Sequence, residues 1–110
     1  MRSNYADRDA KPTLLTAAEA AGTPTRIIIP AAKDQFHVID WIGWSYAGDP
    51  TGGELLVDIG GNRVLQFDIT TGGPGLLQFD RALYVEEDNQ EVDITLTDGG
   101  VAGKLNVRYR

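Results

Sequence analysis

The chain contains no cysteine, which excludes disulfides, thiolate catalysis, cysteine-ligated zinc and iron–sulfur clusters. Nucleophiles and general bases are scarce as well, because the sequence has one histidine, His37, and two serines, Ser3 and Ser45. Cations are too few for a nucleic-acid surface, since 10 Lys and Arg face 16 Asp and Glu and the formal net charge is −6. These shortages predict a protein that is not an enzyme, has no cofactor or metal site and does not bind nucleic acid.

Long hydrophobic runs are absent too. The longest, residues 27–32, falls far short of the roughly 20 apolar residues that a membrane-spanning helix needs. Residues 1–12 mix positive and negative side chains, and the apolar core of a signal peptide does not follow them. We therefore expect a soluble protein without a membrane partner. A length of 110 residues is enough for one domain but not for two.

Glycine and charge divide the chain into two parts. Twelve of the 13 glycines lie between Gly43 and Gly103. Residues 1–33 carry five basic and three acidic side chains, whereas residues 34–110 carry five basic and 13 acidic ones. This division predicts a mildly basic N-terminal arm joined to an acidic body.

We expect the arm to comprise residues 1–24 and to be extended or to form a short helix. The alanine-rich segment 13–21 has the length of about two helical turns, with a threonine as N-cap and Gly22 at its end. Such a short helix is marginal in water unless it packs on something. The rest of the chain, residues 25–110, is predicted to form a single β-sandwich domain.

The body shows the alternation of apolar and polar side chains that is typical of strands with one buried face. Eight segments are predicted strands: residues 26–29, 35–46, 54–59, 63–70, 76–79, 82–85, 91–97 and 104–109. Turn signals rich in Gly, Asn and Pro separate them. About eight short strands at this spacing predict an all-β fold, an antiparallel β-sandwich with a jelly roll as the preferred topology. The strand order stays open at this point.

The segment 35–46 departs from the clean alternation, because both of its sides are apolar. Val38, Ile42, Trp44 and Tyr46 fall on one face, and Ile39 and Trp41 fall on the other with His37. Either the arm or another subunit covers the second apolar face, or a β-bulge shifts the register, for which Gly43 is a suitable position.

One set of residues has the composition of a catalytic triad: Ser45, His37 and Asp40. Ser45 and His37 are eight residues apart on one strand face, which is roughly 26 Å along an extended strand. Asp40 points to the opposite face. The strand prediction therefore excludes a triad.

Three carboxylates, Asp58, Asp68 and Asp93, lie on the polar sides of predicted strands. A glycosidase needs two carboxyl groups about 5–10 Å apart, one of them in an apolar pocket, and no sequence feature marks such a pocket. The acidic run Glu86–Glu91 lacks the ordered spacing of a calcium loop, so we interpret it as a solvated turn.

Two glycine-rich segments, residues 51–53 and 72–75, lack the Lys-Ser/Thr sequence and the helix that follow a phosphate-binding loop, so we interpret both as turns. Trp41, Trp44 and Tyr46 have the composition of an aromatic platform for a sugar. Aromatic side chains are also enriched in cores and protein interfaces, and their alternating positions favour that interpretation.

Four motifs occur in a fixed order: Trp44-Ser45-Tyr46, Pro50-Thr51-Gly52-Gly53, Asp68–Gly75 and Asp98–Val107. Together they resemble small all-β virion proteins of tailed bacteriophages, the kind that decorate or cement capsids, over residues 38–110. The resemblance implies a jelly roll assembled as a homotrimer and located in the virion. It implies the major capsid protein or another virion protein as partner, and it does not separate head, fibre and tail roles.

The sequence therefore predicts a non-enzymatic structural protein that binds and stabilises a phage capsid. We expect the arm to lie on a neighbouring subunit, with complementary charge and apolar burial holding it there. The apolar residues expected to make this contact are Leu14, Leu15, Ile27, Ile28 and Ile29. Two alternatives stay open, namely a carbohydrate- or receptor-binding module of a phage fibre or tail and a small enzyme with an acidic pocket.

Overall fold

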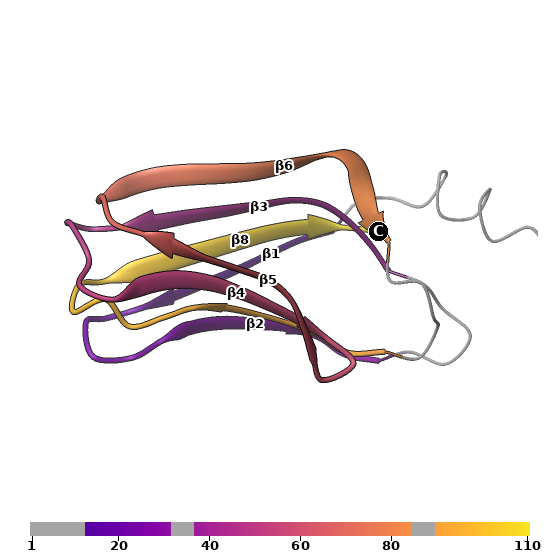
Figure 1. Ribbon diagram of the computed structural model, residues 1–110, viewed down its shortest axis with the longest axis horizontal. Helices are drawn as coiled ribbons and strands as arrows, with labels where there is room; N and C mark the ends of the chain where they lie inside the picture. Colours follow the sequence, from indigo (N-terminus) through magenta and orange to yellow (C-terminus); the bar gives the residue numbers. More distant parts are fainter. Residues whose placement is uncertain (1–12, 32–36, 85–89) are drawn as a thin grey trace, which may run out of the picture.

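Eight antiparallel strands make up the fold (Figure 1). The computed structural model describes residues 13–31, 37–84 and 90–110, and within them it contains no helix. The strands are β1 (Thr13–Glu19), β2 (Thr25–Ile29), β3 (Val38–Tyr46), β4 (Gly53–Ile59), β5 (Asn62–Ile69), β6 (Gly73–Tyr84), β7 (Val92–Leu96) and β8 (Gly103–Tyr109). The prediction of an all-β protein is confirmed.

The strands form two four-stranded sheets, sheet A in the order β1-β8-β3-β6 and sheet B in the order β2-β7-β4-β5. Four of the pairings are nested: β1 with β8, β2 with β7, β3 with β6, and β4 with β5. An antiparallel ribbon of nested pairs that rolls up, so that successive pairs alternate between two facing sheets, is a jelly roll. This architecture confirms the predicted sandwich and supplies the strand order that the sequence left open.

The core fills the space between the two sheets. In β7, Val92, Ile94 and Leu96 are fully buried, whereas Asp93 and Thr95 between them are only partly buried and face outward. Aliphatic side chains from β2, β3, β4 and β8 complete this core. Burying each one contributes about 1.5–3 kcal/mol, so the core holds the two sheets together.

The short helix considered for residues 13–21 is not formed. Residues 13–19 are strand β1, which pairs with β8 along its whole length at the edge of sheet A. Leu15 and Ala17 pack against the core, whereas Leu14 is 56% exposed. Pairing with β8 and burial of one side outweigh the weak helix propensity of alanine in so short a segment. Residues 13–24 thus form β1 and the turn into β2.

A β-bulge lies in β3, but not at Gly43. The register of β3 against both β6 and β8 shifts between Ile39 and Trp41, so Asp40 is the extra residue. Because of this shift, Ile39 and Ile42 both face the core, and Trp41 faces outward. Asp40 pairs with the guanidinium of Arg110 at 2.8 Å. The bulge residue is thus an aspartate with a charged partner and not the predicted glycine.

The two strands predicted over 76–79 and 82–85 are parts of one strand, β6. Leu77 and Gln78 pair with β3, as do Leu83 and Tyr84, but the residues between Gln78 and Leu83 have no partner there. Figure 1 shows β6 bending sharply near its C-terminal end. The sequence break between the predicted strands therefore corresponds to this bend. The described residues contain eight strands, as many as were predicted, because β1 is added and the two segments predicted over 76–79 and 82–85 are counted as one.

The glycine-rich turns join the strands as predicted. Between β4 and β5, Gly60 and Gly61 have φ angles of 58° and 86° and form a two-residue hairpin loop. Positive φ at both positions is typical of a type I′ turn, whose twist matches that of the strands. Residues 71–72 form a turn, but β6 already begins at Gly73.

Candidate interaction surface

The three residues of the excluded triad lie in different surroundings. His37 is buried, with its Nε2 3.2 Å from the carbonyl oxygen of Pro30 and its ring edge-on to Tyr109. Asp40 is held by Arg110 in the bulge, and Ser45 lies near the other end of β3 on the outer side of sheet A. The arrangement brings no base to the serine hydroxyl, so nothing here activates a nucleophile.

The three aromatic residues of β3 do not form a common platform. Tyr46 is buried, and its hydroxyl donates a hydrogen bond of 2.7 Å to the carbonyl of Thr97, just past the end of β7 in sheet B. Trp44 also faces inward, where it packs against Phe67, with ring centroids 5.6 Å apart, and covers Gly75 so closely that a methyl group there would overlap the indole. Trp41 alone reaches the outer surface.

Trp41 belongs to a surface that we call face A, the outer side of sheet A. The register places its side chains in three rows across the four strands: Leu14, Arg108, Trp41 and Gln78; Thr16, Asn106, Gly43 and Leu76; Ala18, Lys104, Ser45 and Pro74. Two of these twelve residues are cations and none is a carboxylate. Leu14 and Leu76 are 56% and 60% exposed. Face A is thus partly apolar and weakly basic.

Two shallow hollows indent face A. One, of about 280 Å³, lies between Thr13, Leu14, Trp41 and Arg108. The other, of about 530 Å³, lies over small side chains of β1, β3 and β8 at the opposite end of the sheet, between Glu19 and Lys104. Hollows floored by small residues and bordered by exposed apolar side chains suit the docking of another protein's side chains.

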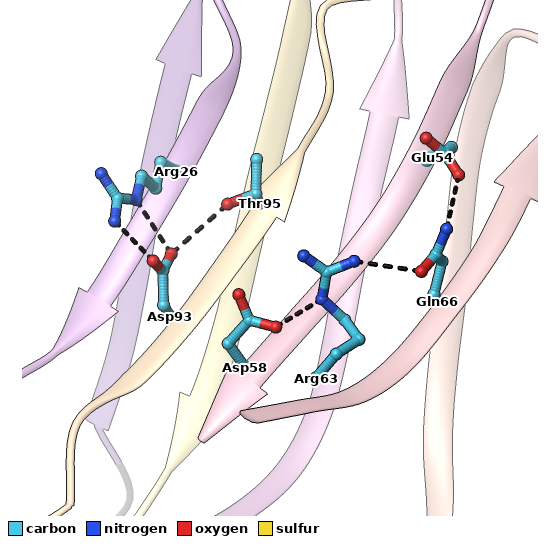
Figure 2. Close-up of polar contacts among 7 residues, drawn as sticks. All are labelled: Arg26, Glu54, Asp58, Arg63, Gln66, Asp93 and Thr95. Carbon is cyan, nitrogen blue, oxygen red and sulfur yellow. Dashed lines mark hydrogen bonds and ion pairs between the residues drawn. The ribbon is translucent and has the colours of Figure 1, made fainter. Parts of the chain in front are cut away.

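The outer side of sheet B, which we call face B, has a different chemistry. Its rows are Ile28, Asp93, Asp58 and Arg63; Arg26, Thr95, Leu56 and Gln66; Glu54 and Asp68. Figure 2 shows two separate groups of polar contacts, one joining β2 to β7 and the other joining β4 to β5. Four carboxylates and two arginines make face B an acidic surface laced with ion pairs.

Each group contains one ion pair with an arginine. Arg26 donates two hydrogen bonds to the carboxylate of Asp93, at 2.9 and 2.5 Å, and Arg63 pairs with Asp58 (Figure 2). The hydrogen bond from Arg26 is the main reason that the pKa of Asp93 lies below its usual value. Each arginine thus offsets the negative charge of a carboxylate in the row where Asp58 lies directly opposite Asp93.

A second pair of carboxylates has no such partner. Glu54 lies directly opposite Asp68 on the neighbouring strand. Within the part of the chain that the structure describes, the only side-chain donor on Glu54 is the amide of Gln66, at 3.2 Å, and neither carboxylate is in an ion pair. Like charges directly opposite each other are unfavourable. Asp58, Asp68 and Asp93, the three carboxylates considered for glycoside hydrolysis, all lie in the rows of face B.

The apolar residues assigned to an arm contact are divided between the inside and the outside. Ile27 and Ile29 are buried in the chain's own core, and Leu15 packs against it. They therefore cannot bind a neighbouring subunit, contrary to the prediction. Leu14, on face A, and Ile28, on face B and 41% exposed, remain available.

Within the described residues, the other features of the sequence add no site. Among residues 13–31, 37–84 and 90–110, no group of three His, Asp or Glu side chains has the arrangement of a metal site. Most of the acidic run, residues 86–89, lies outside the described residues. The structure shows no helix that is long and apolar enough to cross a membrane, in the part of the chain that was searched.

Sequence reasoning identified Trp41 but missed the rest of face A. Its edge strand β1 was assigned to the arm, and the bulge that turns Ile39 inward, so that Trp41 is on the other side, was placed elsewhere. A signal was present, however. Leu14, Leu76 and Trp41 each precede an inward-facing apolar residue, so each belongs to an apolar doublet within a strand. A doublet in a one-sided strand requires one of its members to face outward.

The fold places this chain among the jelly-roll β-sandwiches. No protein-family model matches the sequence, and no curated protein is significantly similar to it. Solved structures do resemble it. The CBM36-1 domain of a multidomain xylanase from the hindgut metagenome of Trinervitermes trinervoides is 11% identical with a TM-score of 0.54, over 90% of this chain and 95% of that domain.

Two further structures have a lower structural similarity. A carbohydrate-binding module CBM36 in complex with calcium and xylotriose is 17% identical with a TM-score of 0.46, over 89% of this chain and 98% of that one. FlhE is 13% identical with a TM-score of 0.44, over 92% and 99%. At these identities the likeness concerns the fold alone.

Proposed function

We propose that this protein is a non-enzymatic structural component of a tailed-phage virion, which binds other virion subunits through face A and stabilises the capsid. The observation that carries the proposal is the contrast between the two outer surfaces. Face B has charged and polar side chains joined in ion pairs, as a solvated surface does, whereas face A exposes Leu14, Leu76 and part of Trp41 without a carboxylate among its rows. The phage assignment itself rests on the motifs in residues 38–110.

The surroundings of the polar residues support the non-enzymatic part of the proposal. His37 is buried against a backbone carbonyl, and Asp58 and Asp93 are occupied by arginines. Catalysis by a pair of carboxylates needs one of them in an apolar pocket with a raised pKa, whereas the pKa of Asp93 is lowered. These contacts occupy His37, Asp58 and Asp93.

The test combines location with binding. The protein should be found by mass spectrometry in purified virions of the phage whose genome encodes it. A variant lacking the two exposed leucines of face A, Leu14→Ser/Leu76→Ser, should bind virions that lack this protein at least about tenfold more weakly than the wild type does. This corresponds to about 1.4 kcal/mol of binding free energy. The matched control is Val64→Ser, because Val64 is 49% exposed on the edge strand β5, outside face A. Unchanged binding by the double variant, or absence from virions, contradicts the proposal.

A second candidate function is a carbohydrate- or receptor-binding module of a fibre or tail. One observation favours it: Trp41 borders the 280 Å³ hollow together with Arg108, and an indole beside a guanidinium suits a sugar ring. The inward position of Trp44 and Tyr46 leaves this site with a single aromatic side chain. Glycan binding that is lost in Trp41→Ala but kept in Leu76→Ser would favour the module over the structural role.

A further inference from the structure

The structure carries an inference about which protein surface fits face A. We propose that face A docks on face B of a second copy of this chain, so that each copy contributes a basic, apolar surface to one contact and an acidic surface to the next. The inference rests on the proposed function to the extent that face A is taken as a protein-binding surface. It adds the identity of one partner and the chemistry of the contact.

Charge complementarity is the first argument. The rows of face A contain Lys104 and Arg108 and no carboxylate. Beside these rows, the carboxylate of the bulge residue Asp40 lies 4.0 Å from Arg108 and 2.8 Å from Arg110, so Arg110 offsets its charge. The rows of face B contain four carboxylates and two arginines. The two surfaces therefore carry net charges of +2 and −2. Complementary potentials favour encounter and fix register between protein surfaces. Face A against face A would instead bring four cations together.

The spacing of the charges also matches. Lys104 and Arg108 lie four residues apart on β8, and Glu54 and Asp58 lie four residues apart on β4. Four residues of a strand span about 13 Å, so the two cations and the two carboxylates have the same separation. Placing β8 over β4 with the strand order reversed also lays all four strands of sheet A over all four of sheet B.

The second carboxylate pair explains what an external cation adds. Glu54 and Asp68 face each other across the β4–β5 ladder, and in the described residues no arginine or lysine pairs with them. A lysine or arginine of a neighbouring copy offsets this repulsion, as Arg26 and Arg63 do for the other two carboxylates. Apolar contacts accompany it, because Leu76 and Leu14 of face A meet a surface that includes Ile28 and Leu56.

The contact is heterologous, since different surfaces of the two copies meet. Faces A and B lie on opposite sides of one sandwich, so a copy bound through face A keeps its own face B free. Such contacts either close into a ring or continue as a stack. Because faces A and B lie on opposite sides of the sandwich, repeated contacts of this kind extend as a stack.

Sedimentation equilibrium of the full chain tests the inference, with three variants. Lys104→Glu/Arg108→Glu reverses the charge of face A, and Glu54→Lys/Asp68→Lys reverses that of face B. The fourfold variant carries all four changes. The wild type should form oligomers that weaken as salt is raised, because exposed charges are screened. Each double variant alone should associate at least about tenfold more weakly. The fourfold variant should associate again, since both charges are swapped. Circular dichroism checks that every variant is folded.

Two results would overturn the inference. One is a wild type that stays at the 11.9 kDa mass of a single chain at all concentrations. The other is a face B variant that associates as the wild type does, which would mean that face A pairs with itself or is not used. Neither result affects the proposed function if Leu14→Ser/Leu76→Ser still loses virion binding. Conversely, self-association without virion binding supports the inference and removes the proposed function.

Discussion

The two outer faces of the sandwich are built by the same period-two alternation, yet their chemistry differs. On face B, the residues between the inward-facing ones are mostly charged and are joined across strands by Arg26 and Arg63. On face A, several of them are apolar, and no carboxylate stands in the rows. The comparison teaches that alternation determines which side chains point outward, but not whether solvent or another protein covers them. An outward position becomes informative where it is apolar.

The largest effect on stability is expected on the inner side of sheet A, which faces the core. Gly75 faces inward beneath Trp44, and a methyl group there would lie 2.3 Å from the indole, whereas at Gly43, on face A, the nearest atom would be 3.5 Å away. Gly75→Ala should therefore lower the free energy of unfolding by about 2–3 kcal/mol. Gly43→Ala should change it by less than about 0.5 kcal/mol. Urea unfolding measures both, and equal effects would break the distinction between the two sides.

A smaller effect is expected where the two sheets are joined. The hydroxyl of Tyr46 in sheet A donates to the carbonyl of Thr97 beside sheet B. Tyr46→Phe should lower the free energy of unfolding by about 1 kcal/mol, because it removes one hydrogen bond and leaves a partly buried carbonyl without this partner. The same denaturation experiment checks this. No change would mean that the hydrogen bond does not help to hold the two faces back to back.

Acid should destabilise face B in particular. The pKa of Asp93 is lowered from 3.8 chiefly by Arg26, so the ion pair contributes stability that is present above that value and is lost as the pH falls through the lowered pKa. At pH 7, Asp93→Asn should cost about 0.5–1 kcal/mol, reduced by the relief of repulsion with Asp58. Thermal unfolding from pH 7 to pH 2 should show wild type and variant converging at the acid end. A constant difference would contradict the assignment of the shift.

The smallest effect on stability is expected on face A itself. Leu14 and Leu76 already expose more than half of their surface, so Leu14→Ser/Leu76→Ser should change the free energy of unfolding by less than about 0.5 kcal/mol. Differential scanning calorimetry of the unassembled protein measures this. A large loss would mean that the leucines serve the fold, and the contrast between binding on face A and stability on face B would no longer hold.

The alternating pattern was sufficient to predict the sandwich and most of its strands, because one-sided burial leaves a period-two signature in β5, β7 and β8. It failed for β1, since the helix propensity of its alanines is a local property whereas pairing with β8 connects opposite ends of the chain. The bulge at Asp40 was misplaced for a similar reason. Asp40 in the bulge contacts Arg110, 70 residues away, and no local pattern contains that pairing.

The candidate surface was predicted only in part. Alternation placed Trp41 on the opposite face of its strand from Trp44 and Tyr46, but it also placed Ile39 with Trp41, whereas the bulge turns Ile39 into the core. Face A also depends on the strand order, because Leu14, Arg108, Trp41 and Gln78 come from four strands that only the topology brings into one row. No local pattern contains that information.

The most direct test of face A as a contact surface is thiol labelling of single-cysteine variants, which is possible because the natural chain has no cysteine. Leu76→Cys places a thiol on face A, and Thr51→Cys places a control thiol on the exposed loop before β4. In the free protein, diluted until it is monomeric, both should react with a maleimide at similar rates. In assembled virions the account predicts that labelling of Leu76→Cys is strongly slowed and that of Thr51→Cys is unchanged. Equal labelling of Leu76→Cys in the free and assembled states would contradict it.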